Sequence, residues 1–242
     1  MPQRKEQLVN GEFYHIVKRG IEERNIFLDN EDYLRFINSL LVFNDKNSAP
    51  WGLRGFWRQR DPDSLVKEYS PKNPLVEINT VSLMPNHFHL LVRQIMDNGI
   101  SILMNKIGGY SYYFNKKYQR IGTLFQDRYK AKLIKTENQL RNNFVYICTN
   151  PVSIIERGWK KWRVENPKKA INFLENKYRW GSYWDYIGKP NFPKVTNREF
   201  FLELFRGEKG IKNEIDSWIN FKSETLKGFI EDSETIKNLI FE

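Results

Sequence analysis

Residues 75–94 read LVEINTVSLMPNHFHLLVRQ, two apolar runs separated only by Pro85 and Asn86. Proline and asparagine favour turns, and two strands joined by so short a connection form an antiparallel hairpin. Side chains two positions apart in a strand share one face, so His87 and His89 project together while Phe88 points the other way. The stretch therefore predicts a β-hairpin that carries two of the three histidines in the chain.

Further elements are predicted on both sides of this hairpin. Alternating apolar residues predict strands over residues 12–20 and 124–135. Helical spacing predicts helices that begin at Asp29 or Asn30, at residue 100 and at Thr136. The order β-α-β-β-α-β-α indicates an α+β, ferredoxin-like (split βαβ) fold, with an antiparallel sheet and helices on one side.

The chain divides into a core and an extension. Residues 1–155 form the predicted core, with an insertion at about 45–75 that is rich in Pro, Gly and charged residues. Residues 156–242 form a mostly helical C-terminal extension, which we expect to pack on the core or to contact DNA.

The composition favours a nucleic-acid partner. The formal net charge is +10 and the pI is about 9.5, which suits a polyanion. The 7 Trp, 12 Tyr and 17 Phe could supply surfaces on which bases stack, although most aromatics belong to the core. We expect no membrane span, no secretory signal and, with Cys148 as the single cysteine, a cytoplasmic location.

Two pairs of residues suggest catalytic chemistry. His87 and His89 could present imidazole nitrogens to one divalent ion, or they could simply be packed. Tyr146 and Asn150 are four residues apart, hence one helical turn apart on one face. An amide oxygen is a fair ligand for Mg²⁺ or Mn²⁺, and a phenolate is a competent nucleophile. The alternative is that Tyr146 packs and Asn150 caps the helix ahead of Pro151.

Four blocks in order, YHIVKRG, LMPNHFHLLV, YYFNKKYQRIGTLFQDRYKAKLI and YICTNPV, resemble the single-tyrosine HUH transposases. The likeness is greatest to the REP-associated tyrosine transposases of the IS200-like group and covers roughly residues 8–155. The resemblance implies that His87, His89 and Asn150 hold a divalent metal, Mg²⁺ or Mn²⁺, and that Tyr146 is the catalytic nucleophile.

The implied reaction is the cleavage and rejoining of single-stranded DNA at sites flanked by hairpins, through a 5′-phosphotyrosine intermediate. The partner would then be single-stranded DNA with a palindromic hairpin, bound by a monomer or a homodimer. The alternative is a domesticated relative that binds DNA hairpins without cutting them.

Several other residues are candidates for DNA contact. Stretches that mix Trp with basic residues, 51–60 and 157–163, could stack on bases. His15 is either a further metal ligand or a packed strand residue. The basic residues expected to contact phosphates are Lys18, Arg19, Arg128 and Lys130, with Lys132 beside them.

Overall fold

The computed structural model describes residues 7–47, 69–161 and 163–224. Its centre is an antiparallel sheet in the order β2-β3-β1-β4. The hairpin turns at Pro85 and Asn86, as predicted. This strand order is that of a split βαβ arrangement, which confirms the α+β, ferredoxin-like class. The strands are β1 (Phe13–Arg19), β2 (Val76–Met84), β3 (His87–Gln94) and β4 (Lys130–Ile134).

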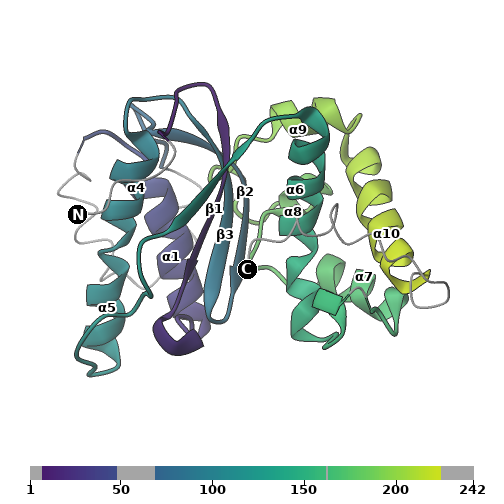
Figure 1. Ribbon diagram of the computed structural model, residues 1–242, viewed down its shortest axis with the longest axis horizontal. Helices are drawn as coiled ribbons and strands as arrows, with labels where there is room; N and C mark the ends of the chain where they lie inside the picture. The colour runs from purple at the N-terminus through teal and green to yellow at the C-terminus, as the bar shows by residue number, and fades with distance from the viewer. Residues whose placement is uncertain (1–6, 48–68, 162, 225–242) are drawn as a thin grey trace.

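One face of the sheet is covered by α1 (Asn30–Phe43), α4 (Gly99–Ile107) and α5 (Tyr110–Lys117), as Figure 1 shows. The helix predicted to start at Asp29 or Asn30 does so, because the Asp29 carboxylate accepts a hydrogen bond from the Asp32 N–H in a capping box. The helix predicted from residue 100 is two helices, separated at Gly108 and Gly109, where glycine is a poor helix former.

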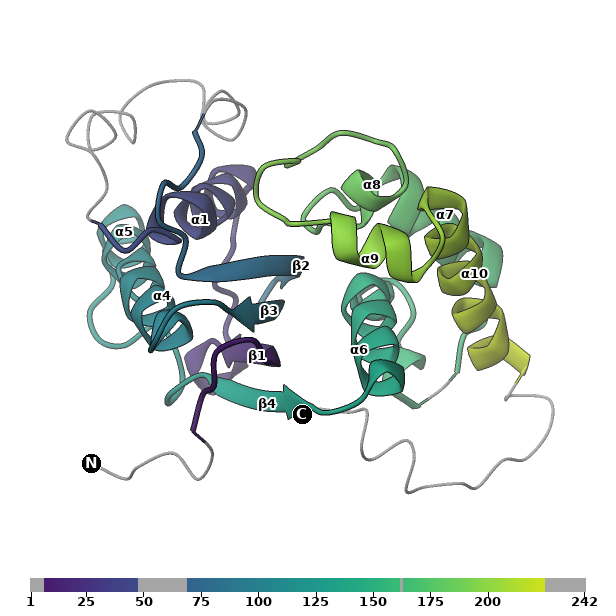
Figure 2. The ribbon, with the colours of Figure 1, turned by 90° about the horizontal axis from the view of Figure 1, so that it is seen from above.

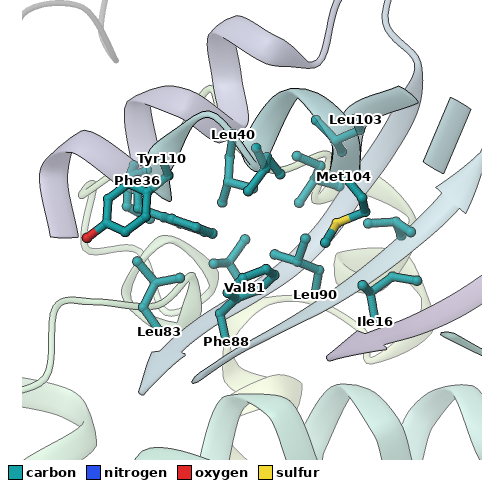
Figure 3. Packing of buried hydrophobic residues seen from close by; sticks show 14 of the residues in the cluster. Ile16, Phe36, Leu40, Val81, Leu83, Phe88, Leu90, Leu103, Met104 and Tyr110 are labelled. Atoms are coloured by element: carbon teal, nitrogen blue, oxygen red, sulfur yellow. The ribbon is translucent and has the colours of Figure 1, made fainter. Parts of the chain in front are cut away.

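The core on this face is apolar and close-packed (Figure 3). Phe88, the residue between the two histidines, points into it and packs against Phe36 at a ring-centroid distance of 4.7 Å. Leu90 follows two residues later on the same face and is fully buried. Because Phe88 and Leu90 fill this core, His87 and His89 must face the other side of the sheet.

That other side is also covered by helices, which departs from the expectation of helices on one side. Helices α1, α4 and α5 lie together on one face, as expected. Helix α6 (Glu137–Thr149) lies on the opposite face of the sheet (Figure 2). The reason is that the second face carries apolar residues such as Leu91 and Ile134, which α6 and the extension bury. The extension contributes α7 (Pro167–Asn176), α8 (Tyr183–Tyr186), α9 (Glu199–Leu204) and α10 (Glu208–Glu224).

The extension also covers the free edge of β2. The Leu83 N–H donates to the Trp180 carbonyl at 2.9 Å, and the Ser182 N–H donates to the Val81 carbonyl at 3.0 Å. Gly181 lies between them, where a Cβ would stand only 3.0 Å from the Val81 oxygen. The aromatic segment that contains Gly181 thus protects an edge that could otherwise pair with another chain.

β4 is shorter than predicted. Residues 124–129 do not continue the ladder, and only Phe125 forms an isolated bridge, to Gly20. Asp127 has a φ of 39°, in the left-handed region that interrupts an extended strand. No helix in the described part of the chain combines the length and apolarity required to cross a bilayer.

Candidate active site

The two histidines of the hairpin lie between the sheet and α6. His87 is 4% exposed and His89 is fully buried, with their ring centroids 4.9 Å apart. In the register of the sheet His87 stands opposite Arg19 of β1, and His89 stands opposite Val17. The hairpin therefore delivers both imidazoles to one point near the end of the sheet, as the sequence predicted.

One ring nitrogen of His87 has no hydrogen-bond partner among the residues that the structure describes. Its Nδ1 lies 2.6 Å from the Asn86 Oδ1, and because that oxygen is an acceptor, Nδ1 carries the proton. The Nε2 is then an acceptor, and it is buried with no hydrogen-bond partner among the described residues. A buried nitrogen lone pair without a partner is unfavourable unless a ligand satisfies it.

His89 is held from both sides. Its Nε2 lies 2.8 Å from the Asn150 amide nitrogen, and its Nδ1 lies 2.9 Å from the His15 Nε2. If the amide nitrogen donates to the His89 Nε2, the proton of His89 is on Nδ1 and is donated to His15. Each imidazole of the hairpin then has a lone pair rather than a proton on Nε2; that of His89 accepts from Asn150, and that of His87 has no partner among the described residues.

Helix α6 places Tyr146 and Asn150 next to these rings. Thr136 caps the start of the helix, and at its end the Asn150 N–H donates to the Tyr146 carbonyl, so the two side chains lie one turn apart as predicted. The Tyr146 ring centroid is 5.7 Å from that of His89 and 5.9 Å from that of His15. Tyr146 retains 8% exposure, while Asn150 retains 1%.

Two tyrosines of α5, Tyr110 and Tyr113, make hydrogen bonds away from the histidine site. The Tyr110 hydroxyl donates to the Ile26 carbonyl, and the Tyr113 hydroxyl donates to the Asp32 carboxylate. Both belong to the core on the opposite face of the sheet from the histidines. The fold therefore brings Tyr146, and neither Tyr110 nor Tyr113, to the imidazole pair.

The donor set fits a divalent cation. Over residues 7–47, 69–161 and 163–224, no three His, Cys, Asp or Glu side chains gather in a way that could hold a metal, so a third protein donor beside His87 and His89 would come from another residue type. Asn150 supplies an amide whose oxygen and nitrogen can exchange places by a flip. Two imidazole Nε2 atoms and an amide oxygen suit Mg²⁺, Mn²⁺ or a similar ion.

Electrostatics keeps the imidazoles neutral, the form that a metal requires. Burial lowers the pKa of His87 to about 3, and the positive charges of Arg19 and Lys160 add to the effect. Burial lowers the pKa of His15 to about 3, with Lys132 acting in the same direction and a hydrogen bond with the Asn143 side chain acting against it. Burial also lowers the pKa of His89 well below its usual value.

The four basic residues predicted to contact DNA line one pocket of about 250 Å³ at the end of the sheet. It adjoins the histidine site, because Arg19 stands opposite His87 in the sheet. Two acidic residues in its wall, Glu23 and Asp127, have φ angles of 57° and 39°, a conformation that is costly for non-glycine residues and often found at functional sites. The pocket is lined by Val17, Lys18, Arg19, Glu23, Gln126, Asp127, Arg128 and Lys130.

Two stretches that mix Trp with basic residues, 51–60 and 157–163, were predicted to stack on bases. Residues 51–60 lie outside the described residues. In the stretch 157–163, Trp159 is 1% exposed, and the Lys222 Nζ lies 3.7 Å from its ring centroid, so Trp159 is structural rather than a surface for bases. The same stretch supplies Lys160, whose charge acts on the histidine pair and which the sequence alone did not assign to the site.

Comparisons with known proteins gave one solved structure and one family model. Among solved structures, a REP-associated tyrosine transposase bound to a REP hairpin superposes with a TM-score of 0.47 at 16% sequence identity, over 82% of this chain and 96% of that one. No curated protein matches the sequence. Residues 57–150, which contain the histidine pair, Tyr146 and Asn150, match the model of the family described as transposase IS200 like. The predicted resemblance to the IS200-like group is thereby confirmed over residues 57–150.

Proposed function

We propose that the protein cleaves and rejoins single-stranded DNA, with Tyr146 as the nucleophile and a divalent cation held by His87, His89 and Asn150. The proposal rests mainly on the observation that β3 and α6 bring their polar side chains to one place. β3 presents the buried His87 Nε2, which has no hydrogen-bond partner in the described part of the chain. Helix α6 places the Tyr146 ring and the Asn150 amide, one helical turn apart, beside the His89 ring of the same strand.

In the proposed reaction, the Tyr146 oxygen forms a bond to phosphorus and the bond from phosphorus to the 3′ oxygen breaks. The phenol loses its proton and the departing 3′ oxygen gains one, which leaves a 5′-phosphotyrosine and a free 3′-hydroxyl. Energy of the phosphodiester is retained, so a 3′-hydroxyl can reverse the step and rejoin strands. When bound, the cation would polarise the scissile phosphate as a Lewis acid.

The chain itself prepares the site for an anion. Arg19 and Lys160 put positive charge beside the imidazoles, which stabilises a phosphate there. The rigid backbones of β3 and α6 hold the nucleophile and the donors in register, which limits the reorganisation needed for reaction. The pocket lined by Lys18, Arg128 and Lys130 continues from this point and would hold the DNA backbone of a strand next to a hairpin.

A labelled oligonucleotide with a hairpin and a single-stranded flank tests the proposal. With Mn²⁺ we expect wild-type protein to retain the 3′-labelled fragment through denaturation and to release the 5′-labelled fragment. EDTA should abolish the reaction. The Tyr146→Phe variant should form no adduct, whereas Tyr112→Phe, which changes a tyrosine that is 73% exposed, should react normally.

Two outcomes would contradict the proposal. Equal adduct from wild type and Tyr146→Phe would remove the nucleophile assignment. If EDTA leaves a tight affinity for hairpin DNA unchanged, and no cleavage occurs at any Mn²⁺ concentration, the protein binds hairpins without catalytic activity.

A further inference from the structure

His15, the third histidine of the chain, lies beside His89 but is not one of the proposed metal ligands. His15 is fully buried on β1, on the face that α6 covers, with its ring centroid 5.1 Å from that of His89. Its Nε2 is 2.9 Å from the His89 Nδ1, a hydrogen-bond distance. That nitrogen is therefore committed to His89.

The direction of this hydrogen bond follows from the groups at the two ends. At one end the Asn150 amide nitrogen faces the His89 Nε2 in the metal-free protein, and in this orientation of the amide Nε2 is the acceptor and Nδ1 the donor. At the other end the Asn143 side chain raises the pKa of His15, which is the effect of a hydrogen-bond acceptor beside an imidazole N–H. The Asn143 amide nitrogen donates to the Gln139 carbonyl at 2.7 Å, which leaves the Asn143 oxygen to accept a proton from His15.

A single direction agrees with both ends: His89 donates to His15, and the proton of His15 is then on Nδ1, the nitrogen that remains for the Asn143 oxygen. A histidine that ligates a metal commonly donates its second N–H to such a partner, which fixes the tautomer and the orientation of the ring. The opposite direction would put the proton on the His89 Nε2, the atom that would have to face the cation.

We propose that His15 is a positioning residue that holds His89 in the Nδ1–H tautomer, so that the His89 Nε2 lone pair faces the cation site. The inference rests on the proposed function and adds to it a role for β1. His15 acts through His89 and does not touch the metal or the DNA. A neutral imidazole accomplishes this without adding a buried negative charge next to a phosphate site.

The tautomer can be read directly in metal-free protein. Long-range ¹H–¹⁵N spectra of protein labelled with ¹⁵N-histidine resolve the protonation of each ring nitrogen, and the chain has only 3 histidines to assign. We expect His89 to carry its proton on Nδ1 in wild type and in His15→Gln, whose side-chain oxygen can accept the same bond. We expect His15→Leu to lose this preference.

Metal affinity provides the second readout. In calorimetric titration with Mn²⁺, His15→Leu should bind about 10- to 100-fold more weakly than wild type, and His15→Gln should recover most of the loss. Leu91→Val is the matched control, because Leu91 pairs with His15 across the sheet and packs on the same face without a polar group. It should leave both the tautomer and the affinity unchanged.

The outcomes separate this inference from the function on which it rests. An unchanged His89 tautomer and Mn²⁺ affinity in folded His15→Leu would overturn the positioning role, even if the DNA adduct forms as proposed. Failure of His15→Gln to restore either property would overturn it as well. A wild-type protein that binds no Mn²⁺ would contradict the proposed function, yet the spectra of the metal-free protein would still show whether His15 sets the tautomer.

Discussion

Acidification from about pH 7.5 to about pH 5.5 is expected to destabilise the metal-free protein strongly, because its three histidines are buried in the neutral form. Burial lowers the pKa of His15 and His87 to about 3 and that of His89 well below its usual value. In the unfolded chain each imidazole has a pKa of about 6.5. Below that value the unfolded state binds protons that the folded state does not, so stability present at neutral pH is lost as the pH falls.

The magnitude follows from linkage. At about pH 5.5 an unfolded histidine gains roughly 1.4 kcal/mol from protonation, while a folded one with a pKa near 3 gains almost nothing. Three such residues give a loss of about 4 kcal/mol, a large part of the roughly 5–15 kcal/mol that stabilises a typical domain. The loss would continue until the pH reaches the folded-state pKa values.

Urea unfolding followed by tryptophan fluorescence, with EDTA and at constant ionic strength, measures this loss directly. His15→Gln removes one of the three groups, so its pH dependence should be about two thirds that of wild type. A wild-type loss below about 1 kcal/mol over this interval would refute the buried, neutral state of the histidines. Identical pH dependence of the unfolding free energy in His15→Gln and wild type would refute this state for His15.

Three further predictions concern the metal, the DNA and the core. Asn150→Ala should weaken Mn²⁺ binding at least about tenfold in calorimetry, because it removes the proposed oxygen donor; unchanged affinity would exclude Asn150 as a ligand. Replacing Arg128 and Lys130 together by alanine should lower the slope of log affinity against log salt for hairpin DNA by about 1.4 to 1.8, since two phosphate contacts are lost; an unchanged slope in fluorescence anisotropy would place the DNA elsewhere. Phe88→Ala should reduce the free energy of unfolding by about 3–5 kcal/mol, because the fully buried ring leaves a cavity against Phe36; a loss below about 1 kcal/mol in urea unfolding would contradict the packing.

Local patterns in the sequence predicted most of the elements. The Pro85–Asn86 turn fixed the hairpin, the Asp29 cap fixed the start of α1, and Pro151 follows the end of α6. Spacing also placed His87 with His89, and Tyr146 with Asn150, because strand and helix periods are short-range properties. These predictions needed no knowledge of how the elements pack.

Long-range features were not accessible in that way. The position of α6 on the second face of the sheet depends on apolar residues of β3 and β4. The alternation of residues in a strand shows which face such a residue occupies, but it does not show which helix packs against it. The role of the aromatic segment around Gly181 depends on pairing with β2, which is distant in the sequence. The hydrogen bond from His89 to His15 joins residues 74 apart, so a lone strand histidine gave no sign of it.

The most direct test of the central claim is to locate the covalent bond to DNA. After reaction with a hairpin oligonucleotide and Mn²⁺, digestion with nuclease and trypsin should leave a nucleotide on the peptide 142–157, which contains Tyr146 as its single tyrosine. We predict that mass spectrometry finds the modification on the Tyr146 side chain and nowhere else. A DNA adduct on any other residue, or cleavage without an adduct, would contradict the account.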